Sequence, residues 1–132
     1  MLELTDRFHQ RTERGFIERV VAAVRDHVER PELEVSLLLT DDAEIAALHG
    51  QFLSDATPTD VMSFEIDNGA EVVVSVETAH RVASRAGHAP DAEVALYVIH
   101  GILHPVGFGY VEDDERRRMR EVELAVMNGL QL

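Results

Sequence analysis

Apolar residues recur along the chain with two different periods, which predict alternating helices and strands. The helical period of three and four residues appears over 15–29, about 42–52, 76–86, about 90–104 and beyond 112. Strand-like alternation or short β-branched runs appear over 33–39, 61–66 and 71–75, and 2–4 is a candidate first strand. The apolar face of the last helix is predicted to include Met119, Val122 and Val126.

Turn-forming residues divide these segments. Asp67-Asn68-Gly69 predicts a hairpin that pairs 61–66 with 71–75 antiparallel. Gly87 is expected to stop one helix and Pro90 to open the next, which Pro105 ends. The pattern predicts an α/β (α+β) fold, in which about five helices cover a small mixed sheet of about four strands in a single domain over 1–132.

The composition narrows the class of protein. A chain of 132 residues with 45% hydrophobic residues can bury one core without disulfides. Because cysteine is absent, any metal must be bound by histidine, carboxylate or water. The N-terminus lacks the basic and apolar regions of a signal peptide, and no run approaches the roughly 20 apolar residues of a membrane span. We therefore expect a soluble cytoplasmic protein with no membrane partner.

The net charge of −13 comes from 25 acidic residues against 12 arginines, with no lysine. Such a balance argues against broad, non-specific binding of nucleic acid. It still allows a local basic groove.

Two histidines carry the candidate chemistry. His100 and His104 lie four residues apart near the end of an apolar helix, so their side chains share one face and can bind one metal ion. Packed or surface histidines with no metal are the alternative. Gly101 replaces the glutamate of an H-E-x-x-H motif, which disfavours an ordinary metalloprotease.

An acidic run precedes the last helix. Glu112, Asp113, Asp114 and Glu115 are followed by three arginines, as in a helix start that favours its dipole and forms pairs such as Glu112–Arg116. Carboxylates so near the histidines are also candidate metal ligands.

The segment from His100 to residue 110 resembles the H-G-x-L-H-L-x-G-Y-D-H signature of the YbeY family of bacterial rRNA maturation factors. Matches in register are His100, Gly101, Leu103, His104 and Gly107. Upstream, 58–64 resembles the P-T-D-V-L-S-F segment of the family, and 71–75 resembles the strand that follows it.

This resemblance implies a zinc-dependent single-strand endoribonuclease, a hydrolase acting in rRNA processing and ribosome maturation. His100, His104 and Tyr110 would bind one zinc ion per chain. Asp60 and Ser63 lie on the segment that lines the cleft beside the metal, and we assign them candidate catalytic roles. The implied partners are an rRNA precursor and ribosomal proteins.

The chain departs from the family pattern at several positions, including Ala56 and Phe108-Gly109, and two departures bear directly on the chemistry. Tyr110 stands where the family has its third zinc-binding histidine, and Leu53 stands where it has an arginine. The third ligand is therefore Tyr110 or one of Glu112, Asp113 and Asp114, unless two ligands hold the metal weakly. The alternative function is a catalytically impaired member that acts as a ribosome-biogenesis binding protein.

Overall fold

The computed structural model describes residues 1–8, 12–53, 60–107 and 112–132. Four strands and five helices follow one another in these residues. They are β1 (Leu2–Asp6), α1 (Arg14–His27), β2 (Glu34–Thr40), α2 (Asp42–Leu53), β3 (Val61–Ile66), β4 (Gly69–Ser75), α3 (Val76–Ala86), α4 (Pro90–Leu103) and α5 (Asp113–Gly129).

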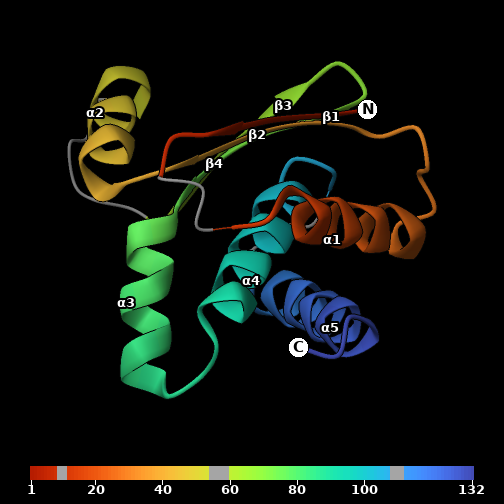
Figure 1. Ribbon diagram of the computed structural model, residues 1–132. Coiled ribbons are helices and arrows are strands. Elements are labelled where there is room, and N and C mark those ends of the chain that lie inside the picture. The colour runs from red at the N-terminus through yellow and green to blue at the C-terminus, as the bar shows by residue number, and fades with distance from the viewer. Residues whose placement is uncertain (9–11, 54–59, 108–111) are drawn as a thin grey trace.

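The four strands form one mixed sheet in the order β1-β2-β4-β3. β2 is parallel to both of its neighbours, β1 and β4, whereas β3 pairs antiparallel with β4. The predicted single α/β domain with a small mixed sheet and five helices is confirmed (Figure 1). The first strand is longer than expected, because its pairing with β2 extends to Asp6.

The antiparallel pair is the predicted hairpin. Val61 lies opposite Val74 and Ile66 lies opposite Gly69, so Asp67 and Asn68 form the turn. Asn68 adopts a left-handed conformation with a φ of 57°, which asparagine tolerates better than most residues.

Helix ends also follow the predicted signals. Gly87 ends α3 with a φ of 77°, and its N–H donates to the carbonyl of Ala83. Pro90 lies in the first turn of α4, where its missing N–H leaves no helical hydrogen bond unmade. Ser75 caps α3 by accepting a hydrogen bond from the Thr78 N–H.

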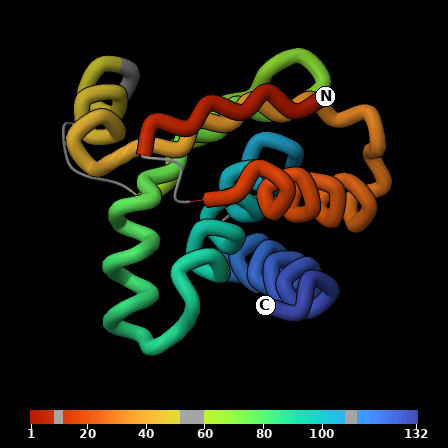
Figure 2. The backbone as a smooth tube through the Cα atoms, viewed as in Figure 1, coloured from red at the N-terminus to blue at the C-terminus, as the bar shows by residue number. Residues whose placement is uncertain are grey.

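Helices α1 and α4 cover one face of the sheet, and α5 packs on these two helices on the side away from the strands (Figures 1 and 2). The inward side chains of β2 are Val35, Leu37 and Leu39, all almost fully buried, as their alternation predicted. Helix α4 lies at the centre of this layer and contacts α1, α3, α5, β3 and β4. It is therefore the element that the main core surrounds.

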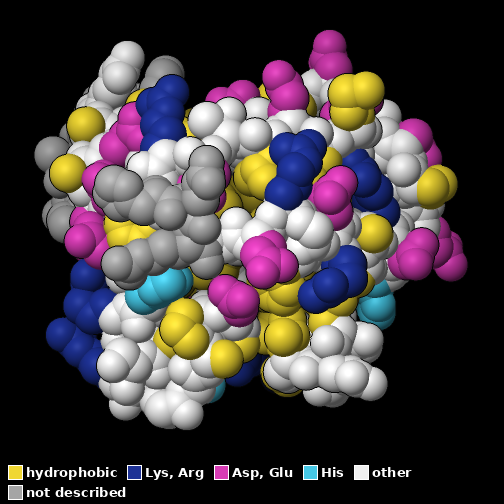
Figure 3. All heavy atoms as spheres, in the orientation of Figure 1, with side chains coloured by type: hydrophobic (Ala, Val, Ile, Leu, Met, Phe, Trp, Pro, Cys, Tyr) yellow, Lys and Arg dark blue, Asp and Glu magenta, His cyan; other side chains and the backbone are white. Residues whose placement is uncertain are grey.

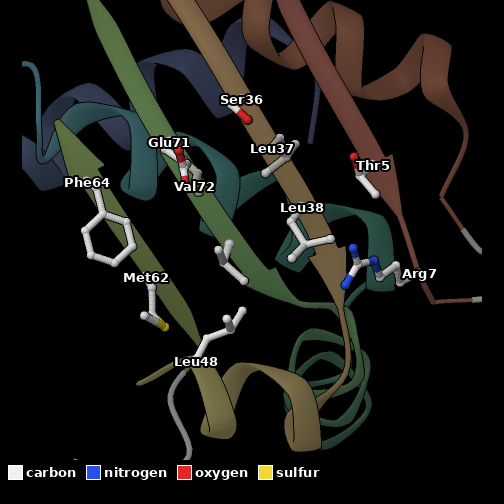
Figure 4. Close-up of a pocket in the computed structure, with 11 residues that line it drawn as sticks. Thr5, Arg7, Ser36, Leu37, Leu38, Leu48, Met62, Phe64, Glu71 and Val72 are labelled. Atoms are coloured by element: carbon white, nitrogen blue, oxygen red, sulfur yellow. The ribbon is translucent and has the colours of Figure 1, made fainter. Parts of the chain in front are cut away.

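The opposite face of the sheet is covered only in part. Ile45 of α2 packs there on Met62 and Val73 in a second, smaller core. Beside it lies an apolar cavity of about 290 Å³, which Figure 4 shows between α2 and the strands, with Phe64, Met62 and Leu48 on one side and Arg7 on the other. None of the residues that line this cavity is a predicted site residue.

No helix in the described ranges is long and apolar enough to cross a membrane. On the face seen in Figure 3, acidic and basic side chains are interspersed.

Candidate metal centre

Helix α4 carries a polar stripe along an otherwise apolar surface. Glu93, Tyr97, His100 and His104 follow one another at intervals of four, three and four residues, so they lie along one side of the helix. The His104 N–H donates to the His100 carbonyl at 3.2 Å, and His104 keeps helical dihedral angles of −58° and −54°. The expected one-turn spacing of the two histidines is therefore present.

Gly101, between the two histidines, brings α4 close to the sheet. A Cβ atom at this position would lie 2.5 Å from Val72 Cγ1 and 3.0 Å from Val61 Cγ2, closer than carbon atoms normally approach. The helix backbone thus packs directly on β3 and β4. This contact places His100 beside the start of β3.

His100 pairs with a carboxylate from the last helix. Its Nδ1 lies 2.6 Å from Oε2 of Glu123, a short distance typical of a charge-assisted hydrogen bond. The side chain of Glu123 is 7% exposed and that of His100 is 36% exposed. Glu123 shares the buried side of α5 with Met119 and Val126, so the packing of that face sets its position.

The two imidazoles have opposite electrostatic environments. The hydrogen bond that His100 donates to Glu123 raises the pKa of His100 against the opposing effect of burial, and the negative charges of Glu123 and Asp60 add to the rise. Partial desolvation lowers the pKa of His104, and the nearby charge of His100 lowers it further. His104 therefore favours the neutral form that binds metals.

A cleft of about 210 Å³ opens beside His100. Its lining residues are Asp60, Val61, Leu96, Tyr97, His100, Arg120 and Glu123. Arg120 Nη1 lies 3.7 Å from the second carboxylate oxygen of Glu123, so the cleft has one cationic group among its acids. Burial raises the pKa of the Tyr97 hydroxyl, as do the nearby Glu93 and Asp60, so this hydroxyl stays protonated.

The two predicted catalytic residues lie in different places. Asp60 precedes β3 and lines the cleft with His100. Ser63 lies within β3 opposite Val72 and does not line the described cleft. Their catalytic roles stay predictions.

The predicted third ligands are not brought to the histidines in the described residues. Glu112 caps α5 in a reciprocal capping box with Glu115. Asp113 pairs with Arg116, and Asp114 Oδ1 lies 3.4 Å from Arg117 Nη1. The prediction of a Glu112–Arg116 side-chain pair is wrong, because the Arg116 guanidinium pairs with Asp113, three residues before it, and not with Glu112.

Across 1–8, 12–53, 60–107 and 112–132, no three histidine, aspartate or glutamate side chains are grouped closely enough to hold a metal ion. Tyr110 lies outside the described residues, and so does the region around it from 108 to 111. The choice among the third ligands thus stays open.

The described residues nevertheless fit part of a zinc site. Two imidazoles one turn apart supply the nitrogen donors that zinc prefers. A carboxylate on the other ring nitrogen is the usual companion of a metal-binding histidine, and Glu123 has that position on His100.

Glu123 and Arg120 are the site residues that the sequence analysis missed. The signal for Glu123 was visible, because it falls four residues after Met119 and three before Val126, on the apolar side of the last helix. A carboxylate at such a position needs a partner when it is buried. Arg120 had no comparable signal among several neighbouring arginines.

Comparisons with known proteins extend over most of the chain. The sequence model of the family described as "Endoribonuclease YbeY" matches residues 3–131. The protein of that name from Heliobacterium modesticaldum is 31% identical to this chain, and the match covers 87% of this chain and 82% of that protein. The one from Thermobifida fusca is 36% identical, and the match covers 83% of this chain and 78% of that protein.

A solved structure has the same fold. The solution structure of TM1509 from Thermotoga maritima superposes with a TM-score of 0.71, covering 99% of this chain and 92% of that protein, at 20% sequence identity.

Proposed function

Because this chain belongs to the YbeY endoribonuclease family, we propose that it is a zinc-dependent endoribonuclease that cleaves single-stranded RNA in rRNA maturation. One observation supports the metal dependence most strongly. His100 and His104 lie one turn apart on α4, and His100 lines a cleft while a buried carboxylate holds its Nδ1.

In this proposal, His100 and His104 hold the metal with a third ligand from Tyr110 or from Glu112, Asp113 or Asp114. Zinc, when bound, supplies a Lewis acid and lowers the pKa of a bound water.

The residues of the cleft have separate tasks. The Arg120 guanidinium attracts the phosphate of an RNA strand and offsets the negative charge of Asp60 and Glu123. The protonated hydroxyl of Tyr97 is hydrogen-bonded to Glu93, and the Asp60 carboxylate is available as a proton acceptor. Arg120 is the one arginine among the described residues that line the cleft, so we expect RNA to bind at this site and not over a broad basic surface.

The test compares the wild type with the double variant His100→Ala/His104→Ala. We expect about one zinc per wild-type chain and cleavage of a single-stranded RNA, and at least a 100-fold loss of activity in the double variant. His27→Ala, an exposed histidine of α1, is the matched control and should retain both properties. Equal cleavage by the wild type and the double variant would overturn the proposal.

A wild-type protein without zinc and without cleavage would instead favour the role of a ribosome-biogenesis binding protein. The net charge of −13 would suit basic ribosomal proteins. Those proteins should then be enriched on the immobilised wild type and equally on the double variant.

A further inference from the structure

Glu123 is a buried carboxylate in the wall of the cleft. Its side chain is only 7% exposed, and it lies on the same face of α5 as Met119 and Val126. A carboxylate removed from water in this way needs strong hydrogen-bond partners. The short contact to His100 Nδ1 supplies one, and Arg120 lies 3.7 Å from the other oxygen.

This contact decides which ring nitrogen of His100 carries the proton. An ionised carboxylate can only accept a hydrogen bond, so the nitrogen that faces it must be the donor. In neutral His100 the proton therefore lies on Nδ1, and the lone pair lies on Nε2. The two helices also hold the plane of the ring, because Glu123 is anchored on α5 and His100 on α4.

The structure assigns to Glu123 the role of a positioning residue, which fixes the Nδ1–H tautomer and the orientation of His100 so that Nε2 is presented to a metal ion. This assignment rests on the proposed function for the identity of the metal. It concerns a residue 23 positions away in the chain, on an element that supplies none of the matched histidines.

The first test is zinc affinity, measured by competition with a chromophoric chelator. Glu123→Leu keeps a similar volume but removes the acceptor, and it should weaken zinc binding about 10- to 100-fold. Glu123→Gln keeps an acceptor oxygen without its charge and should restore part of that loss. Glu121→Gln, an exposed carboxylate of the same helix, is the control and should bind zinc like the wild type.

The second test reads the tautomer directly in zinc-free protein. The ¹⁵N chemical shifts of His100, taken at a pH where the ring is neutral, should show Nδ1–H in the wild type. Glu123→Leu should shift the ring toward Nε2–H, the form that free histidine prefers. Thermal unfolding of each variant verifies that it is folded.

Two results would overturn the assignment. One is an Nε2–H tautomer in the wild type, a measurement that needs no variant to fold. The other is wild-type zinc affinity in folded Glu123→Leu. If the wild type binds no zinc, the proposed metal dependence fails, whereas the tautomer measurement still decides the role of Glu123.

Discussion

The start and the middle of α5 place carboxylates in opposite settings. At its start, Asp113 and Asp114 are exposed and pair with arginines one turn further along the same helix. Ten residues after Asp113, Glu123 is buried and pairs with a histidine from another helix. Exposed pairs within one helix contribute little to stability, whereas a buried carboxylate depends on its partner.

The difference shows which carboxylates of this acidic protein lie at the candidate site. The dense run of acids at the start of α5 serves to begin a helix, and a single acid on its apolar side reaches the candidate site. Local charge density is therefore a poorer guide than the position of a charge on the hydrophobic face.

The largest effect is expected from the packing that holds Glu123 in place. Met119 is 2% exposed and lies one turn before Glu123. Met119→Ala should lower the free energy of unfolding by about 2–5 kcal/mol, because it removes buried methylene groups and leaves a cavity. Urea unfolding monitored by circular dichroism measures this loss.

The control for that experiment is Leu124→Ala, which truncates a side chain that is 47% exposed on the same helix. It should change the free energy of unfolding by less than about 1 kcal/mol. Similar losses in the two variants would mean that the buried face of α5 does not anchor the helix.

Asp42, at the start of α2, is intermediate between the two settings. Burial alone would raise its pKa, but hydrogen bonds from Ser75, Thr78 and Arg81 outweigh that effect and lower it. Asp42→Asn should cost about 1–3 kcal/mol near pH 7, because these donors lose a charged acceptor.

The sign of the pH dependence follows from the lowered pKa. The contribution of Asp42 is fully present above the ordinary aspartate pKa of about 3.9 and disappears as the pH falls through the lower value in the folded protein. The stability difference between wild type and Asp42→Asn should thus shrink between pH 5 and 2. A stability difference that grows as the pH falls would contradict this prediction. Asp26→Asn, at an exposed site on α1, serves as the control.

The smallest effect is expected at the exposed end of α5. Asp113→Asn/Asp114→Asn should lower the free energy of unfolding by about 1 kcal/mol or less, and added salt should reduce the loss further. An unchanged zinc content would exclude both carboxylates, which pair with arginines of their own helix, as the third ligand. Loss of zinc would instead identify one of them as the third ligand.

The fold was largely predictable because its signals are local. The helical periods, the Asn68 turn and the Gly87 stop each depend on neighbouring residues, and all are confirmed. The parallel pairing of β2 with β1 and β4 was not foreseen. Parallel partners are joined through crossovers, so no short stretch of sequence encodes their order.

The candidate site was predictable only where it follows helical spacing. His100 and His104 are neighbours on one helix, so their spacing of four residues in the sequence sufficed to place them together. The pairing of His100 with Glu123 depends on how α5 docks on α4, which the spacing within either helix does not encode. The sequence offered Asp60 and Ser63 as equal candidates for a catalytic role. The course of β3 places Asp60 in the cleft and leaves Ser63 outside it.

Gly101 has a consequence for how this chain can vary over evolution. Every other amino acid carries a Cβ atom, so no single substitution at this position avoids the contact with Val72. Even alanine would force either the Val72 side chain or α4 to shift, and a shift of α4 would move His100 and His104 with it. The position of Gly101 is therefore constrained by packing, although this residue has no side chain to offer a metal or an RNA strand.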